Sequence, residues 1–131
     1  MHKQMGKSAR KSFLGSFKPA IAGLAAAYRS QFNMRFHVAV TLLVLAASFY
    51  FQLAPLEWCV ILFCIGSVIV AELLNTSLEV TVDIASPQIQ EKAGLAKDIA
   101  AAAVLIAAIM SVIIGLIIFI PRILPLVNSW M

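Results

Sequence analysis

The chain has 131 residues, of which 62% are hydrophobic and 12% are charged, whereas about a quarter of the residues of an ordinary soluble domain are charged. This length suits one domain, taken as residues 1–131, and the composition excludes an ordinary water-soluble protein. The net charge of +4 is explained most simply by contact with anionic lipid headgroups. Nucleic acid is not an expected partner of so apolar a chain.

The N-terminal segment, about residues 12–35, is predicted to contain an amphipathic helix that lies in the membrane interface. Pro19 either breaks this helix or begins its second part. Both an anchoring role and a substrate-contacting role are open for the segment. Its apolar and basic residues recur at helical spacing: Phe13, Leu14, Phe17, Ile21, Leu24 and Tyr28, with Lys11, Lys18 and Arg29.

Three transmembrane helices are predicted next, at about residues 36–55, 58–82 and 98–120. Phe36–Leu56 and Ile99–Pro121 contain no Asp, Glu, Lys or Arg, and each exceeds the ~20 apolar residues that cross a bilayer core. The middle span begins with another uncharged stretch and continues with a helical pattern to Asp83. The predicted fold is therefore an all-α membrane protein with three transmembrane helices and an N-terminal surface helix.

The basic residues predict the orientation of these spans, because Lys and Arg concentrate on the cytoplasmic side of a membrane. Every Lys and Arg except Arg122 lies before the first span or between the second and the third. This distribution places the N-terminus and the 83–98 loop in the cytoplasm. The turn between the first two spans and the C-terminal segment then face outward.

The second predicted span carries a polar stripe formed by Glu72, Asn75, Glu79 and Asp83. Their spacing places all four within an arc of roughly 80° and along about 16 Å of one helix. An ionised group as deep as Glu72 costs at least ~2.5 kcal/mol, so it should face a bundle interior or a wet cavity. A divalent cation would relieve the repulsion between the acids, and oxygen ligands suit magnesium or calcium. In the structural alternative, Asp83 ends the helix at the interface, and Asn75 and Thr76 form hydrogen bonds to a neighbouring helix.

Lys97 and Asp98 stand where the third predicted span leaves the cytoplasm. They could form an ordinary interfacial pair. Next to the acidic stripe, however, a cation for phosphate, acids for a metal and a deep acid for a proton would meet in one pocket, and phosphoryl transfer needs these parts. Neither G-x-x-x-x-G-K-[ST] nor G-x-G-x-x-G occurs in the sequence, so a nucleotide would be held in another way. His37 is expected to be an interfacial residue rather than a ligand or a proton shuttle.

These segments resemble the signatures of the small bacterial diacylglycerol kinase family, which includes the undecaprenol kinases. "AELLNTSLEVTVD" (71–83) resembles the pattern E-x-x-N-[TS]-x-[IL]-E-x-x-x-D, and "AKDIAAAAVLI" (96–106) resembles the second signature. "SFKPAIAGL" (16–24) and "NMRFH" (33–37) match the flanking pattern, so the resemblance covers roughly residues 12–122. It implies a lipid kinase of the bacterial cytoplasmic membrane that uses MgATP. It also implies a homotrimer whose active sites are shared between protomers.

The resemblance implies roles for individual residues. Glu72 resembles the catalytic base that takes the proton from the lipid hydroxyl. Glu79 resembles the main metal ligand, with Asn75 beside it to orient the reacting groups. The positions that resemble contacts with the nucleotide or its phosphates are Asp83, Gly94, Lys97 and Asp98.

One position departs from the family pattern. The family usually has a glutamate, which serves as a second metal ligand, where this chain has Gln31 in "RSQFNMRFH". A neutral amide oxygen binds magnesium more weakly than a carboxylate. Either the affinity for the metal falls or its coordination is rearranged.

We expect the chain to phosphorylate undecaprenol, because "FNMRFH" and "IIGLIIFIPRI" look more like the undecaprenol kinase branch. Diacylglycerol is the alternative substrate. A small ion or proton translocator is a weaker rival, because the outer half of the third span offers only Ser111 as a polar partner. A non-catalytic subunit of a membrane assembly is the remaining alternative.

Overall fold

The computed structural model describes residues 15, 17–88 and 90–129. This part of the chain forms α-helices and contains no strand. The helices are α1 (Phe17–Ser30), α2 (Phe32–Tyr50), α3 (Pro55–Ala85) and α4 (Glu91–Asn128). Several residues of the predicted surface helix and of its basic cluster lie outside the described residues: Lys3, Lys7, Arg10, Lys11, Phe13 and Leu14.

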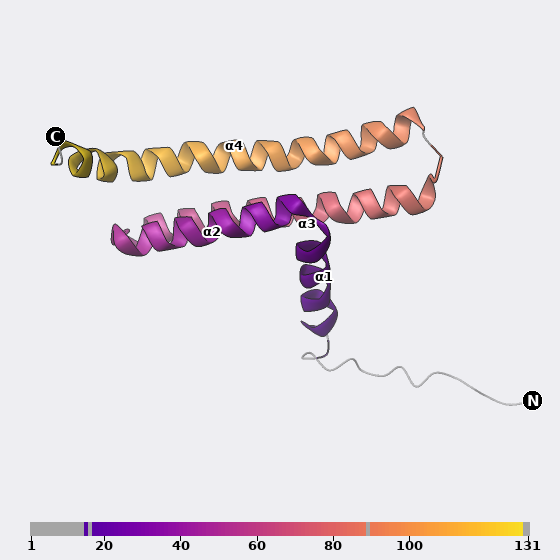
Figure 1. Ribbon diagram of the computed structural model, residues 1–131, viewed down its shortest axis with the longest axis horizontal. Helices are drawn as coiled ribbons and strands as arrows, with labels where there is room; N and C mark the ends of the chain where they lie inside the picture. The colour runs from indigo at the N-terminus through magenta and orange to yellow at the C-terminus, as the bar shows by residue number, and fades with distance from the viewer. Residues whose placement is uncertain (1–14, 16, 89, 130–131) are drawn as a thin grey trace, which may run out of the picture.

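The three long helices α2, α3 and α4 lie side by side, and α1 runs across their common direction (Figure 1). All three are long and apolar enough to cross a membrane, by length and composition. Both α2 and α4 pack on α3 rather than on each other. The all-α class and the presence of three long apolar helices are therefore confirmed. The first of them, α2, ends at Tyr50, before the predicted end of the first span near residue 55, because the chain turns there toward α3.

The bundle has two ends that are named here by their connections. The turn end holds the short α2–α3 turn and the end of α4, and the loop end holds the α3–α4 connection (Figure 1). With 19 residues, α2 is about 28 Å long, whereas α3 with 31 residues is about 46 Å long. Because a helix can continue beyond the hydrocarbon core, α3 and α4 exceed the spans predicted from apolar residues alone.

At the turn end, α4 continues through Pro121 and Pro125, each of which removes one backbone donor from the helix. Arg122 Nη1 donates a hydrogen bond to the Ile118 carbonyl at 2.7 Å. The guanidinium also binds both oxygens of Glu57, at 2.9 and 2.7 Å, and so joins α4 to the first turn of α3. Glu57 in turn accepts a hydrogen bond from the Ala54 N–H at 2.8 Å.

The surface helix α1 begins at Phe17, and Pro19 lies in its first turn, where its missing N–H is not needed. Within α1 the buried residue is Ala27. The predicted apolar face of the helix is exposed, as expected for a helix that buries this face in a bilayer surface. Its exposed members are Phe17, Ile21, Leu24 and Tyr28.

A single extended residue, Gln31, separates α1 from α2, with φ −110° and ψ 125°. This break turns the chain from the surface direction of α1 into the long axis of the bundle (Figure 1). It also places the side chain of Gln31 against α3. The position of Gln31 therefore links the surface helix to the polar stripe.

Candidate active site at the loop end of the bundle

The polar stripe predicted on the second span lies on α3 and becomes steadily less buried toward the loop end. Glu72 is 1% exposed and Asn75 is 6% exposed. Glu79 is half-buried and Asp83 is exposed. The stripe therefore connects the buried interior of the bundle to its solvent-accessible end.

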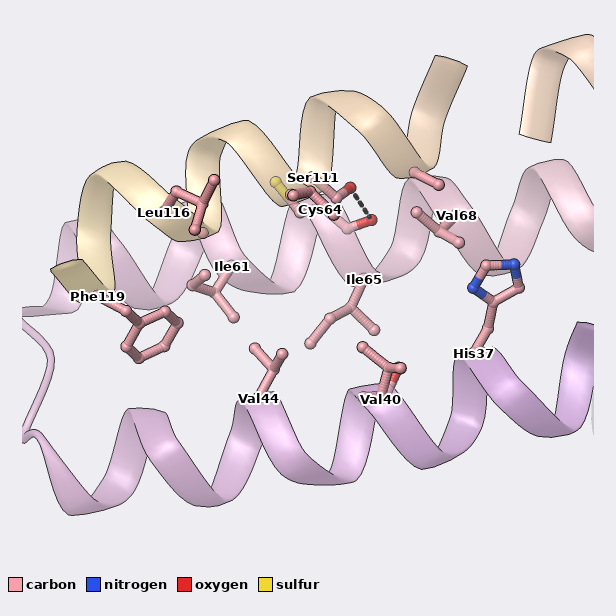
Figure 2. Close-up of a pocket in the computed structure, with 14 residues that line it drawn as sticks. His37, Val40, Val44, Ile61, Cys64, Ile65, Val68, Ser111, Leu116 and Phe119 are labelled. Carbon is pink, nitrogen blue, oxygen red and sulfur yellow. Dashed lines mark hydrogen bonds between the residues drawn. The ribbon is translucent and has the colours of Figure 1, made fainter. Parts of the chain in front are cut away.

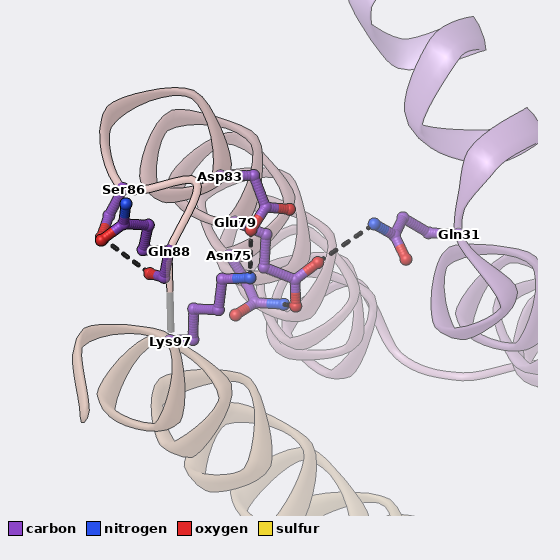
Figure 3. Close-up of polar contacts among 7 residues, drawn as sticks. All are labelled: Gln31, Asn75, Glu79, Asp83, Ser86, Gln88 and Lys97. Atoms are coloured by element: carbon purple, nitrogen blue, oxygen red, sulfur yellow. Dashed lines mark hydrogen bonds and ion pairs between the residues drawn. The ribbon is translucent and has the colours of Figure 1, made fainter. Parts of the chain in front are cut away.

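Glu79 is held by amide groups from two helices. Gln31 Nε2 donates to Glu79 Oε2 at 3.2 Å, and Asn75 Nδ2 donates to Glu79 Oε1 at 3.1 Å. Figure 3 shows these side chains converging along the stripe, with Gln31 reaching across from the start of α2. Each oxygen of this carboxylate thus accepts a hydrogen bond from an amide, and such bonds to a charged acceptor are the stronger kind.

Glu72 and Asn75 line a cavity of about 310 Å³ between α2 and α4, which is called the site cavity below. Glu72 Oε2 and Asn75 Oδ1 are buried there without a hydrogen-bond partner in the described part of the chain. A buried polar atom without a partner is costly, and a carboxylate costs more than a neutral group. Either acceptor can therefore receive the hydrogen bond of a hydroxyl group that enters the cavity.

His37 is half-buried and also lines the site cavity. From the sequence we expected His37 to be an interfacial residue. The sequence alone does not tell which face of α2 turns toward α3, so the contact of His37 with the site cavity was not predicted. Asn33 and His37 are four residues apart and therefore share one face of a helix. This spacing was the available sign of a polar face on α2, and both residues line the site cavity. His37 therefore belongs to the surroundings of Glu72.

A second, polar cavity of about 230 Å³ lies at the loop end, between the end of α3 and the start of α4. It is lined by Gly94 and by Asp83 and Lys97, which form an ion pair across the two helices (Figure 3). In the connection, the Ser86 hydroxyl donates to the Gln88 carbonyl at 3.2 Å. Asp98 is exposed and does not line this cavity.

The family model of prokaryotic diacylglycerol kinase matches residues 18–119, a region that contains the stripe and both cavities. The chain belongs to the prokaryotic diacylglycerol kinase family. The resemblance seen in the two motifs is thereby confirmed. A multi-pass membrane protein is the architecture that this family membership and the three apolar helices support.

Two relatives named by activity match most of the chain. A protein named undecaprenol kinase from Bacillus subtilis (strain 168) is 41% identical over 110 residues, which are 84% of this chain and 89% of the relative. A protein named diacylglycerol kinase from Synechocystis sp. is 39% identical over 116 residues. That second alignment covers 88% of this chain and 66% of the relative.

The residues around Glu79 fit a magnesium ion that is held jointly with phosphates. Among the described residues, no group of three or more His, Cys, Asp and Glu side chains is arranged to hold a metal. Magnesium, however, is usually bound by one or two carboxylates together with waters and substrate phosphates. The oxygens offered here are the Glu79 carboxylate, the unpartnered Asn75 Oδ1 and the amide oxygen of Gln31. This donor set suits a hard cation but includes a single carboxylate.

Proposed function

We propose that this member of the prokaryotic diacylglycerol kinase family is an ATP-dependent lipid kinase that transfers the γ-phosphoryl group of MgATP to the hydroxyl of undecaprenol. The observation that carries the proposal is the buried, unpartnered oxygen of Glu72 beside a cavity large enough for a hydroxyl-bearing group. The 41% identity to a protein named undecaprenol kinase favours this lipid. Undecaprenol phosphorylation would return this carrier lipid to cell-wall synthesis.

In this proposal Glu72 is the catalytic base. A lipid hydroxyl that enters the site cavity can donate its one hydrogen bond to Glu72 Oε2 and can accept a hydrogen bond from the Asn75 amide N–H. Glu72 then takes the hydroxyl proton as the lipid oxygen bonds to the γ-phosphorus, while the bond from that phosphorus to the bridging oxygen breaks and ADP leaves. Low exposure of Glu72 keeps water from competing with the lipid as the acceptor of the phosphoryl group.

The loop-end cavity is proposed to hold the phosphates of the nucleotide. Lys97 is paired with Asp83 and remains partly exposed, so its ammonium can turn to a phosphate oxygen and stabilise charge on the transferring group. Gly94 lies on the same cavity wall, and Asp98 would contact the nucleotide from outside this cavity. Bound magnesium, held by Glu79 with Asn75 or Gln31, would neutralise negative charge on the phosphates.

We further propose that the loop end faces the cytoplasm and that the active enzyme is a homotrimer in the bacterial cytoplasmic membrane. Lys92 and Lys97 lie at the start of α4, at the loop end, and Arg122 lies at the turn end. Three further basic residues lie on α1 and the first turn of α2, on the loop-end side of the α2 span: Lys18, Arg29 and Arg35. Many large apolar side chains of the three long helices are exposed. Lipid and neighbouring protomers would cover them.

Diacylglycerol is the second candidate substrate, favoured by the relative from Synechocystis that carries this name. The deciding experiment uses purified protein in mixed micelles with labelled MgATP, and offers undecaprenol and diacylglycerol separately and in competition. Label on undecaprenol supports the proposal, whereas strong preference for diacylglycerol would replace it with the second candidate. Label on neither lipid, with magnesium present and the fold intact, would refute the kinase activity.

The assignment of Glu72 is tested by Glu72→Gln. We expect a loss of turnover of about 10²–10⁴-fold, the usual contribution of a general base, with helix content and assembly unchanged. Glu91→Gln is the matched control, because Glu91 is an exposed acid in the first turn of α4 and lines neither cavity. If Glu72→Gln unfolds the protein or leaves turnover intact, Glu72 is structural and not the base.

A further inference from the structure

A third cavity, called the apolar cavity here, lies on the turn-end side of Glu72 and measures about 280 Å³. Figure 2 shows side chains of α2, α3 and α4 converging on it, with His37 at one extreme and Phe119 at the other. Its α3 wall comes from Ile61, Cys64, Ile65 and Val68, on successive turns. The cavity exists because α2 and α4 both pack on α3 and leave a groove between them.

The wall of the apolar cavity presents carbon atoms along most of its length. Two lining residues carry hydroxyl groups, Thr41 and Ser111. The Ser111 hydroxyl donates to the Ala107 carbonyl at 2.8 Å and contacts the Cys64 carbonyl at 3.4 Å. This hydroxyl is thus occupied by backbone groups of the bundle itself. The cavity is suited to hydrocarbon rather than to water or to a polar headgroup.

The apolar cavity adjoins the site cavity, because His37 and Ala108 line both. From Glu72 to Ile61 the two cavities together follow α3 for roughly 16 Å, at 1.5 Å per residue. One end of this path holds buried acceptors without partners, Glu72 Oε2 and Asn75 Oδ1. The remainder is lined mainly by apolar side chains, with Thr41 and Ser111 among them, so the path as a whole complements an amphiphile with one small polar end.

We infer that the apolar cavity binds the first part of the prenyl chain of the lipid alcohol, while the hydroxyl of that alcohol lies at Glu72. This inference rests on the proposed function, and it adds a chain-binding site inside the bundle. A prenyl chain in the cavity buries its own apolar surface and that of the wall, which favours binding in proportion to the area covered. His37, at the junction, borders the place where the polar end of the lipid meets the chain.

Gly115 is a position from which the apolar cavity can be filled. It lines the cavity, and a Cβ atom added at this position meets nothing within 4 Å. Leucine also has a better helix propensity than glycine. Gly66 provides the matched control, because it also has nothing within 4 Å of an added Cβ, is exposed and does not line the cavity.

The experiment measures kcat and KM for prenyl alcohols of increasing length, from geraniol to undecaprenol, with the wild type, Gly115→Leu and Gly66→Leu. We expect KM of the wild type to fall with chain length until the cavity is filled. In Gly115→Leu, KM for undecaprenol should rise about tenfold, equivalent to exposing roughly two CH₂ groups. In the same Gly115→Leu variant, KM for geraniol and KM for MgATP should stay within about twofold of the wild-type values. In Gly66→Leu, kcat and KM for every substrate should stay within about twofold of the wild-type values.

Val44→Phe, which narrows the same cavity from α2, should repeat the chain-length effect if Gly115→Leu does not fold. A prenyl alcohol that carries a diazirine adds a readout that does not need turnover. It should label the peptides of α3 and α4 that line the cavity, and it should label them less in Gly115→Leu.

Equal effects of both glycine variants, or equal losses for short and long alcohols, would overturn the inference while leaving the kinase activity intact. Dissociation of the assembly by Gly115→Leu would mean that a second copy covers the cavity. Phosphorylation of no prenyl alcohol together with no labelling would overturn the inference and the proposed substrate together.

Discussion

The helices α3 and α4 are joined by an ion pair at each end of the bundle, and the two pairs differ in a way that separates structure from function. At the loop end, Lys97 and Asp83 have side chains that are 36% and 66% exposed. At the turn end, Arg122 and Glu57 are 30% and 28% exposed, and the guanidinium binds both carboxylate oxygens. The turn-end pair is the more tightly fixed of the two.

The partners available to each pair explain this difference. Glu57 also accepts the Ala54 N–H, and Arg122 also donates to the Ile118 carbonyl, so both side chains have further bonds within their own helix ends. Lys97 and Asp83 instead border a polar cavity of about 230 Å³. We therefore expect the turn-end pair to fasten the helices and the loop-end pair to exchange its internal contact for a ligand.

The largest expected effect is on turnover. Lys97→Met should lower kcat/KM for MgATP by about 10²–10³-fold, because a donor aimed at a transferring phosphoryl group contributes on this scale. Arg122→Met should change it less than about threefold when assayed below the unfolding temperature. Steady-state kinetics on the two variants, side by side, checks this; similar losses in both would remove the distinction between the two ends.

A smaller effect is expected on thermal stability, and in the opposite order. Arg122→Met should lower the unfolding temperature more than Lys97→Met, because it leaves the half-buried Glu57 without its charged partner. Circular dichroism of the protein in one detergent gives both values. The double variant Glu57→Arg with Arg122→Glu should recover part of the lost thermal stability. The corresponding exchange at the loop end, Asp83→Lys with Lys97→Asp, should recover no kinase activity. Recovery of activity by the loop-end exchange would show that this pair is only structural.

The smallest expected effect concerns Gln31, which lies between the surface helix and the stripe. Gln31→Glu adds a carboxylate beside Glu79 and should strengthen apparent magnesium binding by about three- to tenfold, since ligand charge tunes affinity for hard cations. Without magnesium the two carboxylates repel, so the same variant should unfold at a lower temperature than the wild type. Gln52→Glu, at the turn end, is the control of equal charge. Magnesium titration followed by thermal unfolding provides a readout independent of turnover.

Much of the fold is predictable from sequence because apolar runs and basic flanks act locally. Long uncharged stretches must form helices in a membrane, since unpaired backbone groups are costly there. The spacing of Glu72, Asn75 and Glu79 places them on one face of any helix, whatever surrounds it. Those features needed no tertiary information.

Other features depend on contacts between distant residues and could not be predicted. The bond from Gln31 to Glu79 joins residues 48 apart in sequence, and the pair of Arg122 with Glu57 joins residues 65 apart. The place of His37 depends on how α2 is rotated about its axis, which an evenly apolar helix does not reveal. The gradual burial along the stripe likewise arises from where α2 and α4 cover α3.

The single-residue corner at Gln31 has a consequence for how the protein tolerates different membranes. If α1 lies in the membrane interface, as its sequence predicts, the bond from this corner to Glu79 ties the depth of the site to the depth of α1. A thicker or thinner bilayer would then be matched at other parts of the protein rather than at the site. The proline-containing end of α4 and the short turn after α2 are the parts left to adjust. Hydrophobic mismatch would then be absorbed at the turn end, and the chemistry would keep the same distance from the water on the other side.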